Sequence, residues 1–250
     1  MRPASAERSP AARRRGPLIG AALALEFDYA RMAAEIDACE EFFIDTPPYQ
    51  RQVDGVASGL IPFRSESAAN YARIDTMVER DVRRRELRGV RIFYLRNSTE
   101  NDVVERSSFA VTKALPHASW SWRPELASRI PYTIECIESL PYRTLGLIRV
   151  FVCDDTFMPT HRDTDPDANP DYDRSKAVGL SLIPRTGDVG MLIWDRTRRR
   201  ARELSGNALL FDDSNWHGVP MTRGRRITIR IFGEIDPTIF EDRLVDACHA

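Results

Sequence analysis

The sequence has few residues that could form a disulfide scaffold or a structural zinc site. Its four cysteines lie far apart and form no CxxC pair. They are Cys39, Cys136, Cys153 and Cys248. This spacing argues against a zinc knuckle and against a small secreted disulfide fold. Free thiols of this kind suit a reducing compartment, so we expect a cytoplasmic protein.

Long apolar runs and an excess of charge of one sign are also missing. No apolar run approaches the roughly 18 residues that suggest a membrane-spanning helix, and the formal net charge at pH 7 is -1. A chain so close to neutrality has no overall field that attracts it to nucleic acid or to an anionic membrane. We therefore expect neither of these partners, and we expect a monomer or a homodimer.

Motifs of several other enzyme classes are absent from the sequence. It contains neither a phosphate-binding glycine loop nor a GxSxG nucleophile motif. His161-Arg162-Asp163 has the letters of the catalytic triplet of protein kinases. However, the asparagine that should follow five residues later is Ala168, and no DFG motif comes after it.

Length and composition predict one domain with a loose N-terminus. The 250 residues, of which 42% are hydrophobic, suffice for one sizeable core. We expect residues 1–25 to form a disordered or loosely attached tail and residues 26–250 to form a single domain. Arg13 to Leu25 also has the order of a secretory signal, but its apolar part runs without a break into a helical pattern.

Helical patterns come first and strand patterns follow. Apolar residues at three- and four-residue intervals predict helices over 29–43, 68–87 and 124–139. Runs rich in β-formers predict strands over 90–96, 145–153, 177–183, 189–194, 201–204, 208–211 and 226–233. This order predicts an α+β fold whose core, at about 143–236, is a β-sandwich or roll.

Two of the four histidines lie beside short polar motifs in the strand-rich half, in Thr160-His-Arg-Asp163 and Asn215-Trp-His-Gly218. Side chains alternate along an extended segment, so His161 and Asp163 project the same way and can hold one ion. His217 can fill a third position if its strand returns beside the first. Two imidazoles and one carboxylate on one face of an octahedron leave three positions open, as in non-haem iron oxygenases.

The segment that follows His217 alternates between apolar and polar residues. One face would carry Ile227, Ile229 and Ile231, and the other would carry Arg226, Thr228 and Arg230. If the arginine face lines a barrel, the cost of burying those charges requires an anion. If it faces solvent, the arginines simply lie opposite an isoleucine core face, and this alternative stays open.

These motifs together resemble those of the Fe(II)/2-oxoglutarate-dependent oxygenases. A histidine followed nine residues later by Arg226-Ile-Thr228 is similar to their distal iron ligand and 2-oxoglutarate clamp. Residues 206–219 resemble the aspartyl/asparaginyl β-hydroxylase branch, whereas His161-Arg-Asp163 resembles the free-amino-acid (proline) hydroxylases. The resemblance covers about 145–236, and the part before it matches no family that we can name.

The resemblance implies a fold, a set of cofactors and a set of site residues. The fold is a double-stranded β-helix, a cupin-like jelly roll with N-terminal helices packed on one side. The cofactors are Fe(II), 2-oxoglutarate as co-substrate, and O2. The implied iron ligands are His161, Asp163 and His217, and the implied 2-oxoglutarate contacts are Arg226, Thr228 and, near the start of a strand, Lys176.

The resemblance also implies hydroxylation of a C–H bond in a small molecule, a free amino acid or an amino-acid derivative. Asp163 argues against halogenation, because the related halogenases lack that carboxylate. Desaturation and ring closure need the same ligands and stay open. The candidate substrate contacts are Arg64, Arg96, Trp122, Arg149 and Arg230.

Two other functional classes stay open. A cupin-like metalloenzyme that uses no 2-oxoglutarate would usually carry HxH rather than HxD, and it would not need Arg226. A non-catalytic β-sandwich binding module would need no metal at all. In that case His161-Arg-Asp163 would be a surface loop, which the aspartates that follow it keep hydrated.

Overall fold

The computed structural model describes residues 18–45, 90–98, 120–161, 178–195, 200–220, 222–235 and 237–249. Within these ranges the chain is mainly antiparallel β-sheet with a few short helices. The α-helices are α1 (Tyr29–Asp37), α5 (Pro124–Ala127) and α6 (Pro131–Glu138), and 3-10 helices span Glu40–Phe42 and Pro237–Arg243. None of the helices in the described ranges is long and apolar enough to cross a membrane.

The strands form two sheets. The large sheet has the order β13-β1-β10-β7-β12-β5-β3-β2, with β4 paired to β3, and the small sheet has the order β6-β11-β8-β9. Large-sheet strands are β1 (Leu18–Leu23), β2 (Ile44–Asp45), β3 (Arg91–Ser98), β4 (Trp120–Trp122), β5 (Tyr142–Asp154), β7 (Val178–Arg185), β10 (Ala208–Asp212), β12 (Arg225–Ile235) and β13 (Leu244–His249). Small-sheet strands are β6 (Met158–His161), β8 (Met191–Asp195), β9 (Arg200–Leu204) and β11 (His217–Val219).

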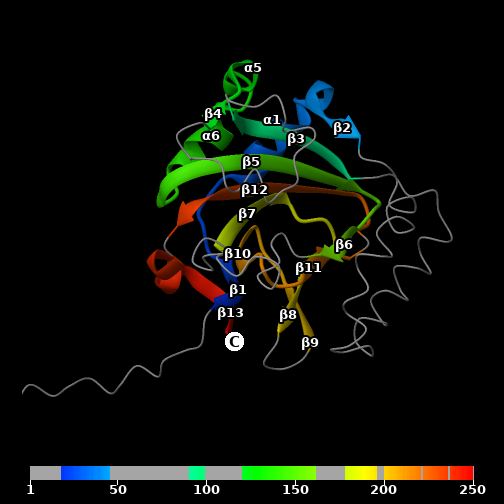
Figure 1. Ribbon diagram of the computed structural model, residues 1–250. Coiled ribbons are helices and arrows are strands. Elements are labelled where there is room, and N and C mark those ends of the chain that lie inside the picture. Colours follow the sequence, from blue (N-terminus) through cyan, green and yellow to red (C-terminus); the bar gives the residue numbers. More distant parts are fainter. Residues whose placement is uncertain are drawn as a thin grey trace, which may run out of the picture.

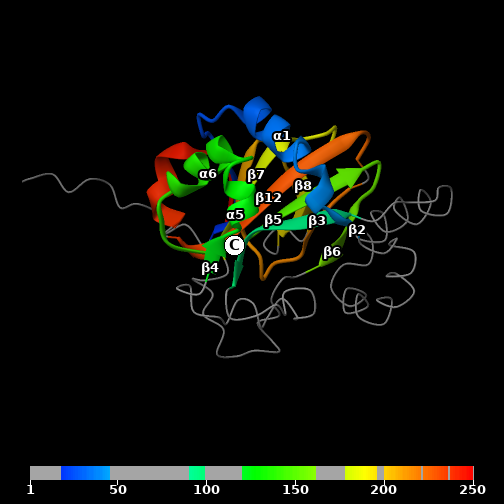
Figure 2. The same cartoon turned by 90° about the horizontal axis from the view of Figure 1, so that it is seen from above.

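Helices cover one face of the large sheet. Figures 1 and 2 show α1, α5 and α6 over strands β5, β12 and β7, with the small sheet on the other side of these strands. We call the helix-covered side the outer face and the side toward the small sheet the inner face. The predicted packing of helices against one side of a β core is thus observed.

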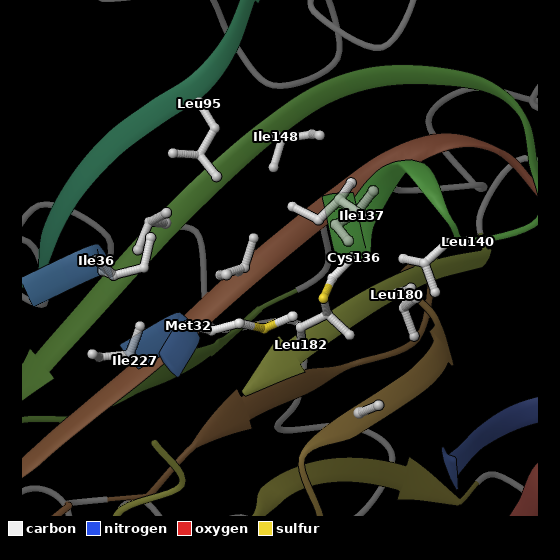
Figure 3. Packing of buried hydrophobic residues seen from close by; sticks show 14 of the residues in the cluster. Met32, Ile36, Leu95, Cys136, Ile137, Leu140, Ile148, Leu180, Leu182 and Ile227 are labelled. Atoms are coloured by element: carbon white, nitrogen blue, oxygen red, sulfur yellow. The ribbon is translucent and has the colours of Figure 1, made fainter. Parts of the chain in front are cut away.

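The outer face is apolar because alternate residues of each strand point to it. Ile227, Ile229 and Ile231 of β12 are fully buried there. Met32 and Ile36 of α1 pack into the same cluster, together with Cys136 and Ile137 of α6 and Leu180 and Leu182 of β7 (Figure 3). Each such side chain contributes about 1.5–3 kcal/mol of burial free energy, so this cluster is the main core of the fold.

A second apolar cluster joins the two sheets. Its members come from strands of both sheets: Ile19, Ala22, Ile183, Met191, Ile193, Leu204, Leu209 and Phe211. This packing closes the space between the sheets at one end. Polar residues on the inner face therefore lie inside the protein rather than on an open surface.

The strand predictions of the C-terminal half are confirmed. Strands β5, β7, β8, β9, β10 and β12 each overlap a predicted run, as does β3. The large sheet also contains strands outside the predicted core range 143–236, among them β1, β3 and β13. The short strands β1, β2, β4, β6, β11 and β13 were not predicted.

The N-terminal boundary was wrong. Leu18–Leu23 form strand β1, which lies between β10 and β13 in the large sheet and is almost entirely buried. The expected tail therefore does not extend to residue 25. Residues 1–17 and the helix expected at 68–87 lie outside the described residues.

Two helix predictions were too long. The pattern at 29–43 gives α1 only as far as Asp37, followed by a 3-10 helix and β2. The helix expected at 124–139 is two helices, α5 and α6, separated at Ile130. Ile130 precedes Pro131 and has φ -125 and ψ 44, because a residue before proline is disfavoured in the α-helical region.

Candidate metal and oxo-acid site

Of the three predicted iron ligands, His217 is the one whose side chain the structure describes. It begins strand β11 and is buried, with 5% of its surface exposed. Its Nδ1 lies 2.9 Å from the carbonyl oxygen of Asn215. A carbonyl only accepts hydrogen bonds, so Nδ1 carries the proton, and Nε2 keeps the lone pair that a metal ion needs.

The turn before His217 is held by its own side chains. The backbone N–H and hydroxyl of Ser214 both donate to Asp212 Oδ1, at 2.9 and 2.6 Å. The N–H of Trp194 in β8 donates to the carbonyl of Trp216 at 2.9 Å. These bonds fix the direction in which β11 leaves the turn, and with it the position of the His217 ring.

The strand register brings the two histidine positions together. His217 in β11 is the direct antiparallel partner of His161, the last residue of β6. Directly opposed residues of antiparallel strands have their Cβ atoms about 4.5–5.5 Å apart on one face of the sheet. Asp163 lies outside the described residues, and in the part of the chain that the structure describes no group of three potential metal ligands is found.

Arg226 lies on the inner face of β12 and is one of the largest fully buried side chains, 2% exposed. Its Nη1 donates to two backbone carbonyls in the β7–β8 turn, Thr186 at 2.7 Å and Val189 at 2.5 Å. Among the described residues no carboxylate forms an ion pair with it. Its Nε is buried and has no hydrogen-bond partner there, and burial lowers its pKa. Such a guanidinium is suited to bind an anionic ligand, to which it would donate hydrogen bonds.

The neighbouring Arg225 shows the opposite arrangement. It points to the outer side, where Nε donates to Asp154 Oδ1 and Nη1 to Asp37 Oδ1, both at 2.9 Å. Arg185 joins the same Asp37 at 2.8 Å, so this group of charges ties the end of α1 to the sheet. These hydrogen bonds and charges outweigh the effect of burial and raise the pKa of Arg225.

The cross-strand partner of Arg226 on β5 is Cys153. Cys153 is buried beside Phe157 and Val90. Burial raises the pKa of its thiol to about 12, against the smaller lowering effect of Arg226. The thiol is therefore neutral at physiological pH and does not offset the charge of Arg226.

Thr228 and Arg230 follow Arg226 on the inner face. Thr228 is partly buried, and Arg230 is 4% exposed. Arg149 of β5 is the direct register partner of Arg230. Four residues predicted to contact 2-oxoglutarate or the substrate thus share the inner face. They are Arg226, Thr228 and Arg230 on β12 and Arg149 on β5.

Arg96 and Trp122 serve a different part of the fold. They are register partners in β3 and β4, and the Arg96 guanidinium lies 5.5 Å from the Trp122 ring centroid. Arg96 donates to the carbonyls of Leu145 and Trp120, both at 2.6 Å. Within the described residues neither side chain contacts His217 or Arg226, and their roles as substrate contacts stay predictions. Arg64 and Lys176 lie outside the described residues.

Several residues of the site were not singled out from the sequence. Asp213, 1% exposed, forms an ion pair with Arg230 at 3.0 Å. Gly179 of β7 leaves room for Arg230, because a Cβ atom there would lie 2.4 Å from the guanidinium. A glycine inside a predicted strand is a sign of such a close approach, and this sign could have been used.

Comparison with known proteins gives distant structural likenesses. No known family model and no curated sequence matches the chain. It is similar to a 2OG-Fe(II) oxygenase family oxidoreductase from Burkholderia pseudomallei (TM-score 0.36, 14% identity, covering 83% of this chain and 90% of that chain). A Trichoplax adhaerens prolyl hydroxylase in complex with a hypoxia inducible factor peptide fragment has TM-score 0.36 and 13% identity, with 59% and 64% covered. A Pseudomonas putida prolyl-4-hydroxylase has TM-score 0.32 and 13% identity, with 82% and 99% covered. Structural likenesses this distant do not identify a family for this chain.

Proposed function

We propose that this protein is an Fe(II)- and 2-oxoglutarate-dependent oxygenase. The observation that carries the proposal is the register pairing of His217 with His161, two residues before Asp163. Arg226, nine residues after His217, adds the second half of the site. It is buried and forms no ion pair with a carboxylate of the described residues.

The strand order supports a double-stranded β-helix, the fold of this class. From β5 to β8 successive strands alternate between the large and the small sheet, and β10, β11 and β12 alternate again. The central orders β10-β7-β12-β5 and β6-β11-β8-β9 are those of an eight-stranded roll. In such a roll β6 and β11 lie side by side, and their register places positions 161 and 217 opposite one another.

His161, Asp163 and His217 would hold the Fe(II) ion. His217 offers Nε2, because Nδ1 is committed to the Asn215 carbonyl. Two imidazoles and a carboxylate on one face leave positions for 2-oxoglutarate and O2. When bound, iron would couple the oxidation of 2-oxoglutarate by O2, which releases succinate and carbon dioxide, to the insertion of the second oxygen atom into a C–H bond.

Arg226 would hold the distal carboxylate of 2-oxoglutarate. The carbonyls of Thr186 and Val189 orient one side of its guanidinium. A planar fork with five N–H donors matches a carboxylate, and burial strengthens the pairing because water is excluded. Thr228 would add a hydroxyl on the same face, and Lys176 would add a second basic contact.

We propose hydroxylation of a small molecule, a free amino acid or an amino-acid derivative. This follows from the local resemblance of residues 206–219 and of His161-Arg-Asp163 to hydroxylases of amino acids. The same ligand set would also serve desaturation or ring closure.

One spectroscopic experiment tests the proposed function. Anaerobic addition of Fe(II) and then 2-oxoglutarate to the full chain should give a weak visible charge-transfer band and, in air, slow formation of succinate. A cupin-like enzyme that does not use 2-oxoglutarate would bind the metal without the band. A binding module would give neither, and either of these two results would contradict the proposal.

A further inference from the structure

We infer that Arg149 and Arg230 together bind a carboxylate of the substrate, so that the protein acts on amino-acid-sized carboxylic acids. This inference rests on the proposed function, because it concerns the substrate side of the same site. It assigns to the two arginines a carboxylate other than the one that Arg226 would hold.

The two arginines form part of one row across the inner face of the large sheet. Arg230 of β12 has Arg149 of β5 as its register partner on one side and Ser181 of β7 on the other. Tyr94 of β3 continues the row beyond Arg149. Register partners share a face, so both guanidinium groups belong to the side on which Arg226 and the small sheet lie.

Aromatic rings bring the two guanidinium groups together. The Arg230 Cζ atom lies 4.7 Å from the ring centroid of Phe232, and the Arg149 Cζ atom lies 5.5 Å from the same centroid. Both guanidinium groups therefore lie beside the same ring. An aromatic ring also excludes water, which strengthens a guanidinium–carboxylate contact.

A second aromatic ring connects this pair to the candidate metal site. The Phe211 centroid lies 4.1 Å from the Arg230 Cζ atom and 4.9 Å from the centre of the His217 ring. One ring thus contacts both a proposed iron ligand and one of the two arginines. A ligand held by Arg230 would lie beside the position where the proposed oxidation takes place.

The fold holds Arg230 in this position. Asp213 accepts from Nη2 at 3.0 Å, and Gly179 provides the space through which the side chain reaches β10. Asp213 is 1% exposed, so the pair lies in a low-dielectric setting where its geometry is firmly fixed. We regard Asp213 as a positioning residue.

A ligand carboxylate between the two guanidinium groups would interact favourably with both. Like charges directly opposed in neighbouring strands repel one another, and Asp213 offsets the charge of Arg230. A carboxylate has two oxygens and can accept from both groups at once. Arg226 lies four residues along β12 from Arg230, roughly 13 Å in an extended strand, so one carboxylate cannot serve both.

The test uses two matched sets of compounds with the full chain. One set is the free L-amino acids and their N-acetyl derivatives, and the other is the corresponding primary amides. The readout is succinate formed above the substrate-independent rate, with product mass as a check. We expect at least one acid to stimulate turnover, and its amide to do so roughly tenfold less well or worse.

Variants connect that preference to the two arginines. Arg149→Gln and Arg230→Gln should raise the KM for the stimulating acid roughly tenfold or more and remove the preference over the amide. The KM for 2-oxoglutarate should stay close to that of the wild type. Arg143→Gln, an exposed arginine on the same strand, is the matched control and should change neither value.

If Arg230→Gln does not fold because Asp213 loses its ion-pair partner, Arg230→Gln combined with Asp213→Asn replaces the buried ion pair with a neutral hydrogen-bonded pair. Equal stimulation by acids and amides, stimulation by neither set, or an unchanged acid preference in the variants would overturn the inference. A selective rise in the KM for 2-oxoglutarate in Arg230→Gln would also overturn it. In each case, the charge-transfer band of the wild type reports separately on the proposed function.

Discussion

The two faces of strand β12 are both buried, yet they are built from opposite kinds of residue. The outer face presents Ile227, Ile229 and Ile231 to the helices, and the inner face presents Arg226 and Arg230 to the small sheet. Burial of the isoleucines stabilises the fold, whereas burial of the arginines costs free energy unless an anion compensates it. The outer face accounts for stability, and the inner face points to binding.

Arg225 and Arg226, at adjacent positions of β12, show the same difference between the outer and the inner face. Arg225 meets two carboxylates at the margin of the outer face, whereas the hydrogen bonds of Arg226 to described residues go to two backbone carbonyls in the interior. Loss of the first should affect stability, and loss of the second should affect ligand binding.

The largest effect is expected from His217→Ala. Two remaining ligands hold a labile divalent ion poorly, so Fe(II) binding and turnover should be lost. Calorimetric Fe(II) titration measures the binding, and circular dichroism checks the fold. His249→Ala, at the edge of the large sheet, is the control and should bind Fe(II) normally. Tight Fe(II) binding by His217→Ala would refute the ligand assignment.

Arg226→Ala should raise the apparent KM for 2-oxoglutarate while Fe(II) affinity stays nearly unchanged. The lost charge-assisted pair should cost on the order of 2–5 kcal/mol, a rise of about tens- to thousands-fold in KM. Arg226→Lys should recover only part of the affinity, because an ammonium group cannot form the fork. Steady-state kinetics of succinate formation measures both variants. Arg225→Ala is the matched control and should leave this KM unchanged.

Ile229→Ala should have the converse effect. A fully buried isoleucine shortened to alanine leaves a cavity, and the free energy of unfolding should fall by about 2–5 kcal/mol. Affinity for 2-oxoglutarate in the folded fraction should not change, because Ile229 points to the helices. Denaturant unfolding and 2-oxoglutarate titration at low temperature separate the two quantities. An altered affinity with unaltered stability would contradict the assignment of the faces.

The smallest effect concerns the charges at the margin of the outer face. Burial alone would raise the pKa of Asp154, but hydrogen bonds and charges from Arg225 and Arg91 together lower it. A carboxyl whose pKa is lower in the folded state stabilises the protein above its unfolded pKa of about 3.9. This stability is lost as the pH falls through the folded pKa.

Asp154→Asn should therefore destabilise the protein at neutral pH by about 1 kcal/mol or less, since these side chains are partly exposed. The difference from the wild type should shrink as the pH falls below about 4. Thermal unfolding of both proteins across pH measures this. A difference that persists unchanged at low pH would show that Asp154 acts through packing rather than charge.

The sequence predicted the parts of the site that follow from local alternation. The two faces of β12 could be assigned because an extended strand alternates, and the spacing from His217 to Arg226 was visible directly. The pairing of His161 with His217 could be expected only on the condition that the strands returned to one another. The register of β6 and β11 meets that condition.

Other features depend on contacts between distant segments, which local patterns do not encode. Asp213 and Gly179 belong to the site because both serve Arg230 of β12. Strand β1 is stabilised by pairing with β10 and β13, so residues 18–23 resembled the end of a tail when taken alone. Two features were within reach of sequence reasoning. The break at Pro131 follows from the restriction that proline places on the residue before it, and the close approach at Gly179 is indicated by a glycine inside a predicted strand.

The most direct test of the central claim is an anaerobic crystal structure with Fe(II) and 2-oxoglutarate, with iron located by its anomalous scattering. We expect one iron ion bound by His161, Asp163 and His217, with the distal carboxylate of 2-oxoglutarate on Arg226. Iron bound away from His217, or 2-oxoglutarate whose distal carboxylate lies on Arg230 instead of Arg226, would contradict it.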